Sequence, residues 1–243
     1  MGNHNQELLL KWADGGSYGC NKDVVPKMLR LEKEEDRIQL LRDSFYENIH
    51  AFEWEALWES ETEIPQWDPC IKGQHVPAIV FIPAQASEEE RQAERGCVLV
   101  APGGGYNVEA DTTEGWPIIE RLTREGLHCA LLVYRLRPYA RHLSLLDAQR
   151  AIRWLRYNAK RLNILKDKIA MLGGSAGGNL TCMCGVHFDE GNPNATDMTD
   201  RESCRLNACI SMYGTFSACS YPGAEDNFDL GNNQLARSPG PRS

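Results

Sequence analysis

The segment 173–178 combines a serine with four glycines at a spacing that suits nucleophilic chemistry. It reads Gly-Gly-Ser-Ala-Gly-Gly, so Ser175 has one glycine two positions before it and another two positions after it. Gly-x-Ser-x-Gly between a strand and a helix is the nucleophile elbow, a turn too tight for a Cβ at either glycine. The serine hydroxyl then projects above the sheet, and the following helix favours negative charge near its N-terminus. This pattern predicts a serine that attacks a carbonyl carbon.

Two other interpretations of the same segment stay open at this point. Gly/Ser-rich segments after strands often form turns that carry no chemistry. A phosphate-binding loop is the sharper rival, but the segment has neither a Gly-Lys-Ser/Thr sequence nor the Gly-x-Gly-x-x-Gly spacing. The pentapeptide alone does not distinguish a plain turn from a nucleophile. A second motif is needed to distinguish them.

That second motif is the glycine triplet 103–105, which directly follows an apolar run and Pro102. Three glycines let backbone N–H groups turn toward a ligand without side-chain obstruction, and acyl transfer needs such donors around its oxyanion. Losing one donor costs about 10²–10³ in rate. A dinucleotide-binding fingerprint fails here because Val108 occupies the place of its third glycine. A glycine triplet and a serine elbow two βα units later form a much more specific pair than either motif alone.

Apolar runs that alternate with helical patterns must position these two motifs. The predicted strands are 76–82, 96–101, 127–134, 169–172 and 207–213, and the predicted helices are 113–126, 147–157 and the elbow helix to about residue 187. Such alternation indicates right-handed βαβ crossovers, a mostly parallel sheet and an α/β fold. Both motifs follow the carboxyl end of a strand, where α/β proteins place their chemistry.

The sequence before and after this region differs in character. Apolar residues recur every three or four positions over 24–58, which predicts one or two amphipathic helices that cover the sheet or, less simply, cap a substrate cleft. We therefore expect an N-terminal arm with amphipathic helices over 1–60, an α/β domain over 61–230 and an irregular tail over 231–243.

Composition excludes several classes of protein. The 243 residues carry a net charge of −8 without a long basic cluster, which argues against nucleic acid and anionic membranes as partners. Nine cysteines without a Cys-x-x-Cys pair indicate free thiols in a reducing compartment rather than a zinc site. No signal core, myristoylation pattern or membrane-spanning run is found, so we expect a soluble, cytoplasmic protein.

The two motifs, with Tyr-Arg-Leu at 134–136, the helix 147–153 and Ser-Met-Tyr at 211–213, resemble the α/β-hydrolase superfamily. Within it, the chain is similar to the esterase/lipase group related to hormone-sensitive lipase and bacterial acetyl-xylan esterases, over roughly residues 55–215. The resemblance implies an α/β-hydrolase fold with helices on both faces of the sheet. It also implies Ser175 as the nucleophile and the N–H groups of Gly104, Gly105 and Ala176 as the oxyanion hole.

The same resemblance implies a substrate and a structural pair. It points to small-molecule or carbohydrate esters with short acyl groups, acetyl among them, and to chemistry that needs no metal or organic cofactor. Asp147 and Arg150 are expected to have structural roles in the helix before the elbow strand. Their positions alone suggest the same, as an i,i+3 pair near a helix start.

One departure from the family concerns the base. The family's order is serine, then an acid after a later strand, then a histidine, but the only histidine after Ser175 is His187, at the end of the elbow helix and expected to point away from the serine. Asp226 and Asp229 come too early for the acid. We therefore interpret the chain as the front part of an esterase that lacks the last strands, which leaves strand 207–213 as an exposed edge.

A serine without a base is a poor nucleophile, so impaired activity is expected. Two other functions stay open from the sequence. The first is a non-catalytic hydrolase-fold protein that binds a ligand or a partner in the cleft, and the second is a peptidase of the same fold. The acyl and alcohol preference and the oligomeric state do not follow from the sequence.

Overall fold

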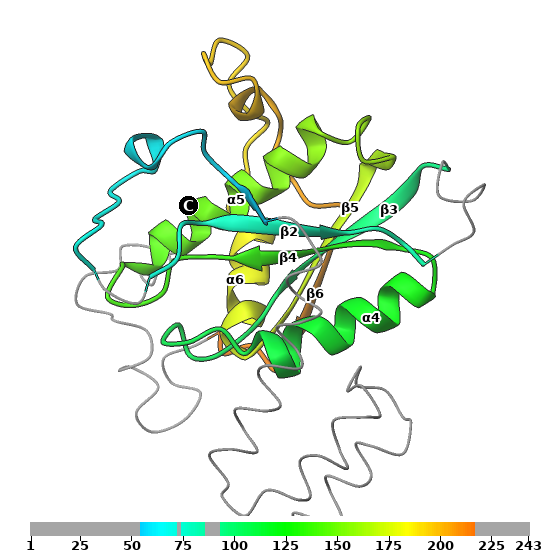
Figure 1. Ribbon diagram of the computed structural model, residues 1–243, viewed down its shortest axis with the longest axis horizontal. Coiled ribbons are helices and arrows are strands. Elements are labelled where there is room, and N and C mark those ends of the chain that lie inside the picture. Colours follow the sequence, from blue (N-terminus) through cyan, green and yellow to red (C-terminus); the bar gives the residue numbers. More distant parts are fainter. Residues whose placement is uncertain (1–53, 72–73, 86–92, 217–243) are drawn as a thin grey trace, which may run out of the picture.

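The computed structural model describes residues 54–71, 74–85 and 93–216, and its centre is a mixed sheet (Figure 1). The strand order in these residues is β1-β2-β4-β3-β5-β6, with β1 and β2 antiparallel to their neighbours and β4, β3, β5 and β6 mutually parallel. The strands are β1 (Trp54–Ala56), β2 (Ala78–Ile82), β3 (Arg95–Ala101), β4 (His128–Val133), β5 (Ile164–Gly174) and β6 (Ala208–Met212).

Helices lie on both faces of this sheet, α4 on one face and α5 and α6 on the other (Figure 1). They are α4 (Trp116–Arg124), preceded by a π-helical turn η3 (Asp111–Gly115), then α5 (Arg141–Tyr157) and α6 (Ser175–Val186). Two short 3₁₀ turns complete the described part, η1 (Glu61–Glu63) and η4 (Thr199–Arg201). The expected α/β-hydrolase architecture, a mostly parallel sheet covered on both faces, is confirmed.

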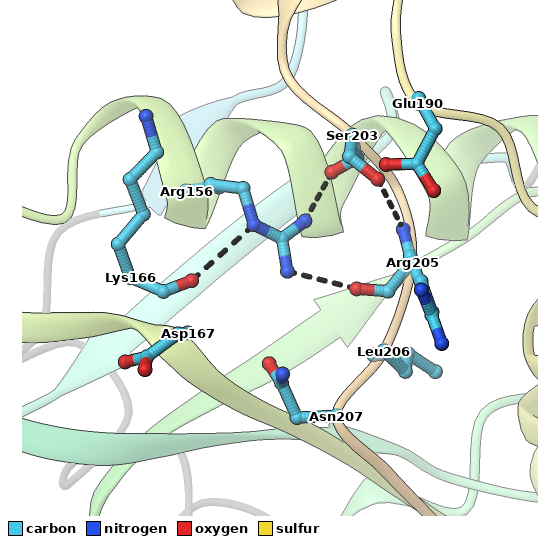
Figure 2. A pocket seen from close by; sticks show the side chains of 8 residues that line it. All are labelled: Arg156, Lys166, Asp167, Glu190, Ser203, Arg205, Leu206 and Asn207. Atoms are coloured by element: carbon cyan, nitrogen blue, oxygen red, sulfur yellow. Dashed lines mark hydrogen bonds between the residues drawn. The ribbon is translucent and has the colours of Figure 1, made fainter.

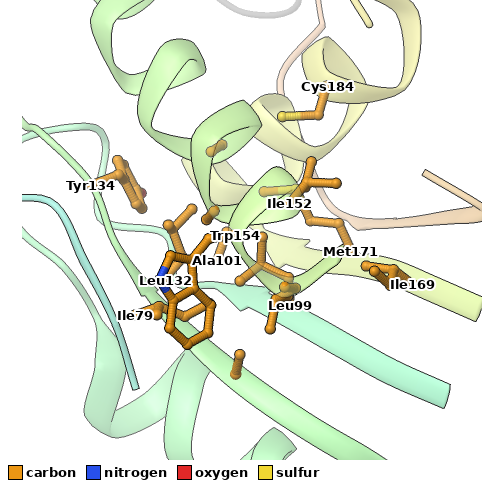
Figure 3. Packing of buried hydrophobic residues seen from close by; sticks show 14 of the residues in the cluster. Ile79, Leu99, Ala101, Leu132, Tyr134, Ile152, Trp154, Ile169, Met171 and Cys184 are labelled. Carbon is orange, nitrogen blue, oxygen red and sulfur yellow. The ribbon is translucent and has the colours of Figure 1, made fainter. Parts of the chain in front are cut away.

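The alternation of side chains along the central strands divides the core into two clusters. In β3, Leu99 and Ala101 face α5 and α6, whereas Val98 and Val100 face α4. Figure 3 shows the first and larger cluster, in which aromatic and aliphatic side chains of α5 pack on the strands; its labelled members are Ile79, Leu99, Ala101, Leu132, Tyr134, Ile152, Trp154, Ile169, Met171 and Cys184. Since β3 and β4 are buried on both sides, they have the continuous apolar sequence expected of parallel strands.

The N-terminal helical prediction is wrong at its C-terminal end. Residues Trp54–Ala56 form β1, which pairs antiparallel with Ala78–Val80 of β2, so the sheet begins before the predicted boundary at residue 61. A three-residue edge strand carries too little periodicity to compete with the helical pattern that precedes it. The rest of the predicted helices, 24–53, and the tail over 231–243 lie outside the described residues.

The predicted pair between Asp147 and Arg150 is also wrong. Helix α5 starts at Arg141, so Asp147 lies in its interior, where its carboxylate forms a fully buried ion pair with Arg135 at 2.6 Å. Arg135 also donates its backbone N–H and Nε–H to Asp147, which ties the end of β4 to α5. Arg150 instead pairs with Asp197 and Asp200 of the loop after α6.

Within the described residues, β6 forms one edge of the sheet, opposite β1, and pairs only with β5. Its first three residues are exposed, and Ile210 keeps 46% of its surface accessible. An apolar edge strand without charged residues is a template for pairing with another chain. No helix in the described ranges is long and apolar enough to cross a membrane.

Candidate active site

Ser175 directly follows the end of β5 at Gly174 and is the first residue of α6, and its backbone is strained. Its φ is +50°, in the left-handed region that serine rarely adopts, and its side chain is partly accessible. Strained non-glycine residues of this kind gather at functional sites, where the surrounding structure holds them in place. The predicted elbow between strand and helix is therefore present at the predicted position.

The glycines around Ser175 let α6 approach the sheet backbone to backbone. A Cβ on Gly177 would lie 2.0 Å from the carbonyl oxygen of Ala101 at the end of β3, and one on Gly173 would lie 2.3 Å from the carbonyl oxygen of Gly177. A Cβ on Gly178 would lie 2.8 Å from Oγ of Ser211 in β6. Because two of these clashes are with backbone atoms, no rotamer change relieves them, and the elbow needs glycine at these positions.

The glycine loop after β3 lies directly against the serine. A Cβ on Gly103 would come within 2.9 Å of Cβ of Ser175 and within 2.7 Å of the carbonyl oxygen of Gly174. Gly104 and Gly105 follow with φ of +123° and +64°, conformations that favour glycine. The structure thus brings together two motifs that lie about seventy residues apart in the sequence.

Side chains from three other elements fix the glycine loop. The Tyr134 hydroxyl donates to the carbonyl of Pro102 at 2.6 Å, and the N–H of Gly103 donates to Oε2 of Glu114 at 2.9 Å. The Tyr106 hydroxyl donates to Oδ1 of Asn179 in α6 at 2.9 Å, which links the loop to the elbow helix. None of these roles could be predicted from the sequence, because each hydrogen bond joins residues that lie far apart along the chain.

Burial favours the neutral form of three titratable groups around the loop. Burial raises the pKa of Tyr106 and of Tyr134, so both phenols remain hydrogen-bond donors. Burial also raises the pKa of Glu109 from 4.5 to about 8, although its Oε1 accepts the backbone N–H of Tyr134 at 2.8 Å, which acts in the opposite direction. The raised pKa favours the protonated form of the Glu109 carboxyl in the folded protein.

Two histidines in the described part of the chain lie away from Ser175. His187 is exposed at the C-terminal end of α6, about 18 Å along the helix axis from its first residue at 1.5 Å per residue. His128 begins β4, at the opposite end of the parallel strands, and its Nδ1 accepts the N–H of Ala84 at 3.0 Å. Burial lowers the pKa of His128, so its ring stays neutral. His142 lies in the first turn of α5.

A cavity of about 660 Å³ lies at the other end of the sheet (Figure 2). It is lined by residues of α5, of the start of β5 and of the segment before β6: Arg156, Lys166, Asp167, Glu190, Ser203, Arg205, Leu206 and Asn207. The guanidinium of Arg156 donates to the carbonyls of Lys166, Ser203 and Arg205, so it fastens three chain segments to one another. We regard this cavity as structural because Ser175 follows the far end of β5.

Within the described ranges, no three His, Cys, Asp or Glu side chains come together as a metal site. The seven cysteines described there are all free thiols. The chemistry at the elbow therefore has to be argued from the serine, the glycine loop and the side chains that hold it.

Comparisons with known proteins agree with this fold. A family model described as BD-FAE matches residues 84–236, more than half of the chain. The solved structure of an acetyl ester-xyloside bifunctional hydrolase from Caldicellulosiruptor lactoaceticus is 39% identical, with a TM-score of 0.57 over 63% of this chain and 54% of that one. Thermogutta terrifontis esterase 2 is 18% identical, with a TM-score of 0.54 over 73% of this chain and 61% of its own, a likeness that shows the fold alone.

Several relatives by sequence are named esterases. Esterase LipC of Mycobacterium tuberculosis is 27% identical over 120 residues, which cover 49% of this chain and 30% of LipC. An acetylxylan esterase of Xylanibacter ruminicola is 32% identical over 84 residues, covering 35% of this chain and 18% of that enzyme. The chain thus matches less than a third of the length of these curated relatives.

Proposed function

The chain belongs to the BD-FAE family of α/β-hydrolases, and we propose that it is a serine carboxylic ester hydrolase with Ser175 as its nucleophile. The observation that carries this proposal is the contact between the two motifs: Ser175, strained at a φ of +50°, lies against Gly103 of the glycine loop. A binding surface has no need of a strained serine beside a glycine loop, whereas acyl transfer uses both.

In the proposed reaction, Oγ of Ser175 attacks the ester carbonyl carbon and loses its proton to a base. The carbonyl oxygen becomes an oxyanion, which accepts hydrogen bonds from the backbone N–H groups of Gly104, Gly105 and Ala176. The bond to the alcohol breaks, the alcohol leaves with a proton, and an acyl-enzyme remains. Water then attacks the acyl carbon by the same route and regenerates the serine. The positive φ of both loop glycines and the start of α6 at the serine support this assignment.

The proposal requires a base, and His187 is too far along α6 to serve. A site that keeps its oxyanion hole but has no such base would retain only about 10³–10⁴-fold catalysis over water. Reading the coding sequence beyond residue 243 in all three frames tests whether a catalytic acid and base follow. A strand followed by an aspartate, then a strand followed by a histidine, supports the proposal; a stop codon with no such sequence counts against it.

For the substrate we propose short acyl esters, with acetyl groups on carbohydrates as the favoured class. Two relatives support this choice through their names, an acetylxylan esterase and an acetyl ester-xyloside hydrolase. Acetylated xylo-oligosaccharides compared with p-nitrophenyl acetate and octanoate provide the test. Release of acetate at a rate above that of the Ser175→Ala variant is expected, and equal rates for the two proteins contradict the proposal.

Labelling with a fluorophosphonate, followed by peptide mapping, tests the nucleophile itself. We expect one adduct, on Ser175, that is absent from Ser175→Ala and retained in Ser203→Ala. Ser203 is a suitable control because it is also partly exposed and lies in the segment that lines the cavity at the other end of the sheet. Labelling of Ser175→Ala as fast as the parent shows that the assignment is wrong.

A second function is favoured by the position of His187 alone. In this alternative, the protein binds an ester or a partner at the elbow and, without a base at Ser175, does not cleave it. Saturable binding of an acetylated oligosaccharide, together with no labelling and no turnover in a version extended to the full coding sequence, supports this alternative over the esterase.

A further inference from the structure

We propose that Glu114 is a positioning residue for the reaction at Ser175, which acts by holding the glycine loop in the conformation that binds the oxyanion. This inference rests on the proposed function of Ser175. Sequence analysis and resemblance give Glu114 no role at the site, and the proposal comes from where the π-helical turn η3 places its carboxylate.

The carboxylate of Glu114 occupies the space between the two motifs. Its Oε2 accepts the N–H of Gly103 at 2.9 Å. The same oxygen lies 2.4 Å from the point that a Cβ of Gly103 would occupy, and Cβ of Ser175 lies 2.9 Å from that point. The carboxylate oxygen and the serine Cβ are therefore at most about 5.3 Å apart, the sum of these two distances. On its other side, Oε2 lies 2.6 Å from the position of a Cβ on Gly174.

Two glycines leave room for this carboxylate. Any side chain on Gly103 or Gly174 would collide with it, so the absence of side chains at both positions is matched to the presence of Glu114. Besides allowing unusual backbone angles, the two glycines therefore leave space for the carboxylate of Glu114 to reach the site from η3. The arrangement joins β3, β5 and η3 through one side chain.

The local backbone directs Glu114 toward the loop. Its segment forms a π-helical turn instead of starting the α-helix at once, and π-helical turns are frequent at functional sites. The carbonyl of Ala110 accepts the N–H of Glu114 at 2.7 Å, and the N–H of Ala110 donates to the carbonyl of Gly103 at 3.0 Å. Gly103 is thus held on both sides, through its carbonyl by Ala110 and through its N–H by Glu114.

Loss of the acceptor should release the most mobile part of the site. Glycine loses more conformational freedom on folding than any other residue, so three consecutive glycines need external contacts to stay in one conformation. Oxyanion stabilisation depends on donors that are already aimed at the developing charge. Without Glu114, the N–H of Gly103 loses its partner and the following two N–H groups lose their fixed direction.

The test compares three variants of the full 243-residue chain. Glu114→Ala removes the acceptor, and Glu114→Gln keeps an amide oxygen at the same position in place of the carboxylate. Glu125→Ala is the matched control, an exposed glutamate after α4 that pairs with Arg121. We expect the rate constant for fluorophosphonate labelling of Ser175 to fall at least tenfold in Glu114→Ala, to stay within threefold in Glu114→Gln, and to be unchanged in Glu125→Ala.

Amide hydrogen exchange over residues 100–110 provides a readout that needs no chemistry at Ser175. Exchange should accelerate at least tenfold in Glu114→Ala alone, with urea midpoints confirming that every variant is folded. Parent-like labelling or exchange in Glu114→Ala overturns the inference, as does a loss in Glu114→Gln equal to that in Glu114→Ala. A parent that labels no faster than Ser175→Ala refutes the proposed function instead, and the exchange result still decides whether Glu114 holds the loop.

Discussion

Replacing Gly177 with alanine is expected to force α6 away from β3, at a cost that the structure allows us to estimate. The added Cβ would lie 2.0 Å from the carbonyl oxygen of Ala101 and 2.8 Å from that of Pro102, whereas real Cβ atoms keep at least about 3.0 Å from such atoms. The helix must therefore move by about 1 Å. Overpacking of this kind costs about 1–3 kcal/mol, and the upper end applies because backbone atoms cannot rotate away.

Alanine in place of glycine also stabilises a helix by about 1 kcal/mol, so the net destabilisation is about 2 kcal/mol. With a urea m-value of about 2 kcal/mol/M, the unfolding midpoint should fall by about 1 M at unchanged m. The matched control is Gly185→Ala in the same helix, where the new Cβ would meet only Sγ of the exposed Cys209, at 2.8 Å. Because that thiol can rotate away, the urea unfolding midpoint of Gly185→Ala should stay within about 0.5 M of the parent's. Equal midpoints for Gly177→Ala and Gly185→Ala would refute the proposed backbone contact.

Three further predictions follow from other parts of the structure. Asp147→Ala should lower stability by about 3–5 kcal/mol in a urea melt, because it leaves the guanidinium of Arg135 buried without its partner. Since burial raises the pKa of Glu109 from 4.5 to about 8, the stability that its proton confers is complete below pH 4.5 and is lost as the pH rises through 8. Glu109→Gln should flatten that decline in melts recorded across this range. Ile210→Lys should reduce self-association measured by light scattering, because a charge on an apolar edge strand opposes edge-to-edge pairing.

Each of these has an outcome that counts against it. A loss for Asp147→Ala no larger than for Asp200→Ala, a more exposed carboxylate in an ion pair, would contradict the buried pair. If parent and Glu109→Gln lose stability in parallel as the pH rises, another group titrates. Equal scattering by Ile210→Lys and by Val186→Lys, an exposed apolar position on α6, would show that the β6 edge has no special part in association.

The central strands and both glycine motifs could be predicted because their signals are local. Buried parallel strands such as β3 and β4 read as continuous apolar runs, and the sharp turns after β3 and β5 require glycine. The alternation of strands and helices then placed Ser175 and the glycine loop at the carboxyl end of the parallel strands. Their contact follows from the topology, in which β3 and β5 are direct neighbours.

What the sequence did not reveal depends on long-range partners. Spacing within one helix favoured an Asp147–Arg150 pair, but the carboxylate pairs with Arg135, and nothing in a local pattern distinguishes the two. The edge strand β1 has three residues, too few to show the alternation of apolar and polar residues that identifies a strand. Glu114 looks like an ordinary first-turn acid in a linear sequence, since only the fold brings its carboxylate against Gly103.

The most direct test of the account is a crystal structure of the protein with a phosphonate bound covalently to Ser175. The account predicts that the phosphoryl oxygen lies within about 2.7–3.1 Å of the backbone nitrogens of Gly104, Gly105 and Ala176. A phosphonate attached to another residue, or a phosphoryl oxygen turned away from the glycine loop, would contradict it.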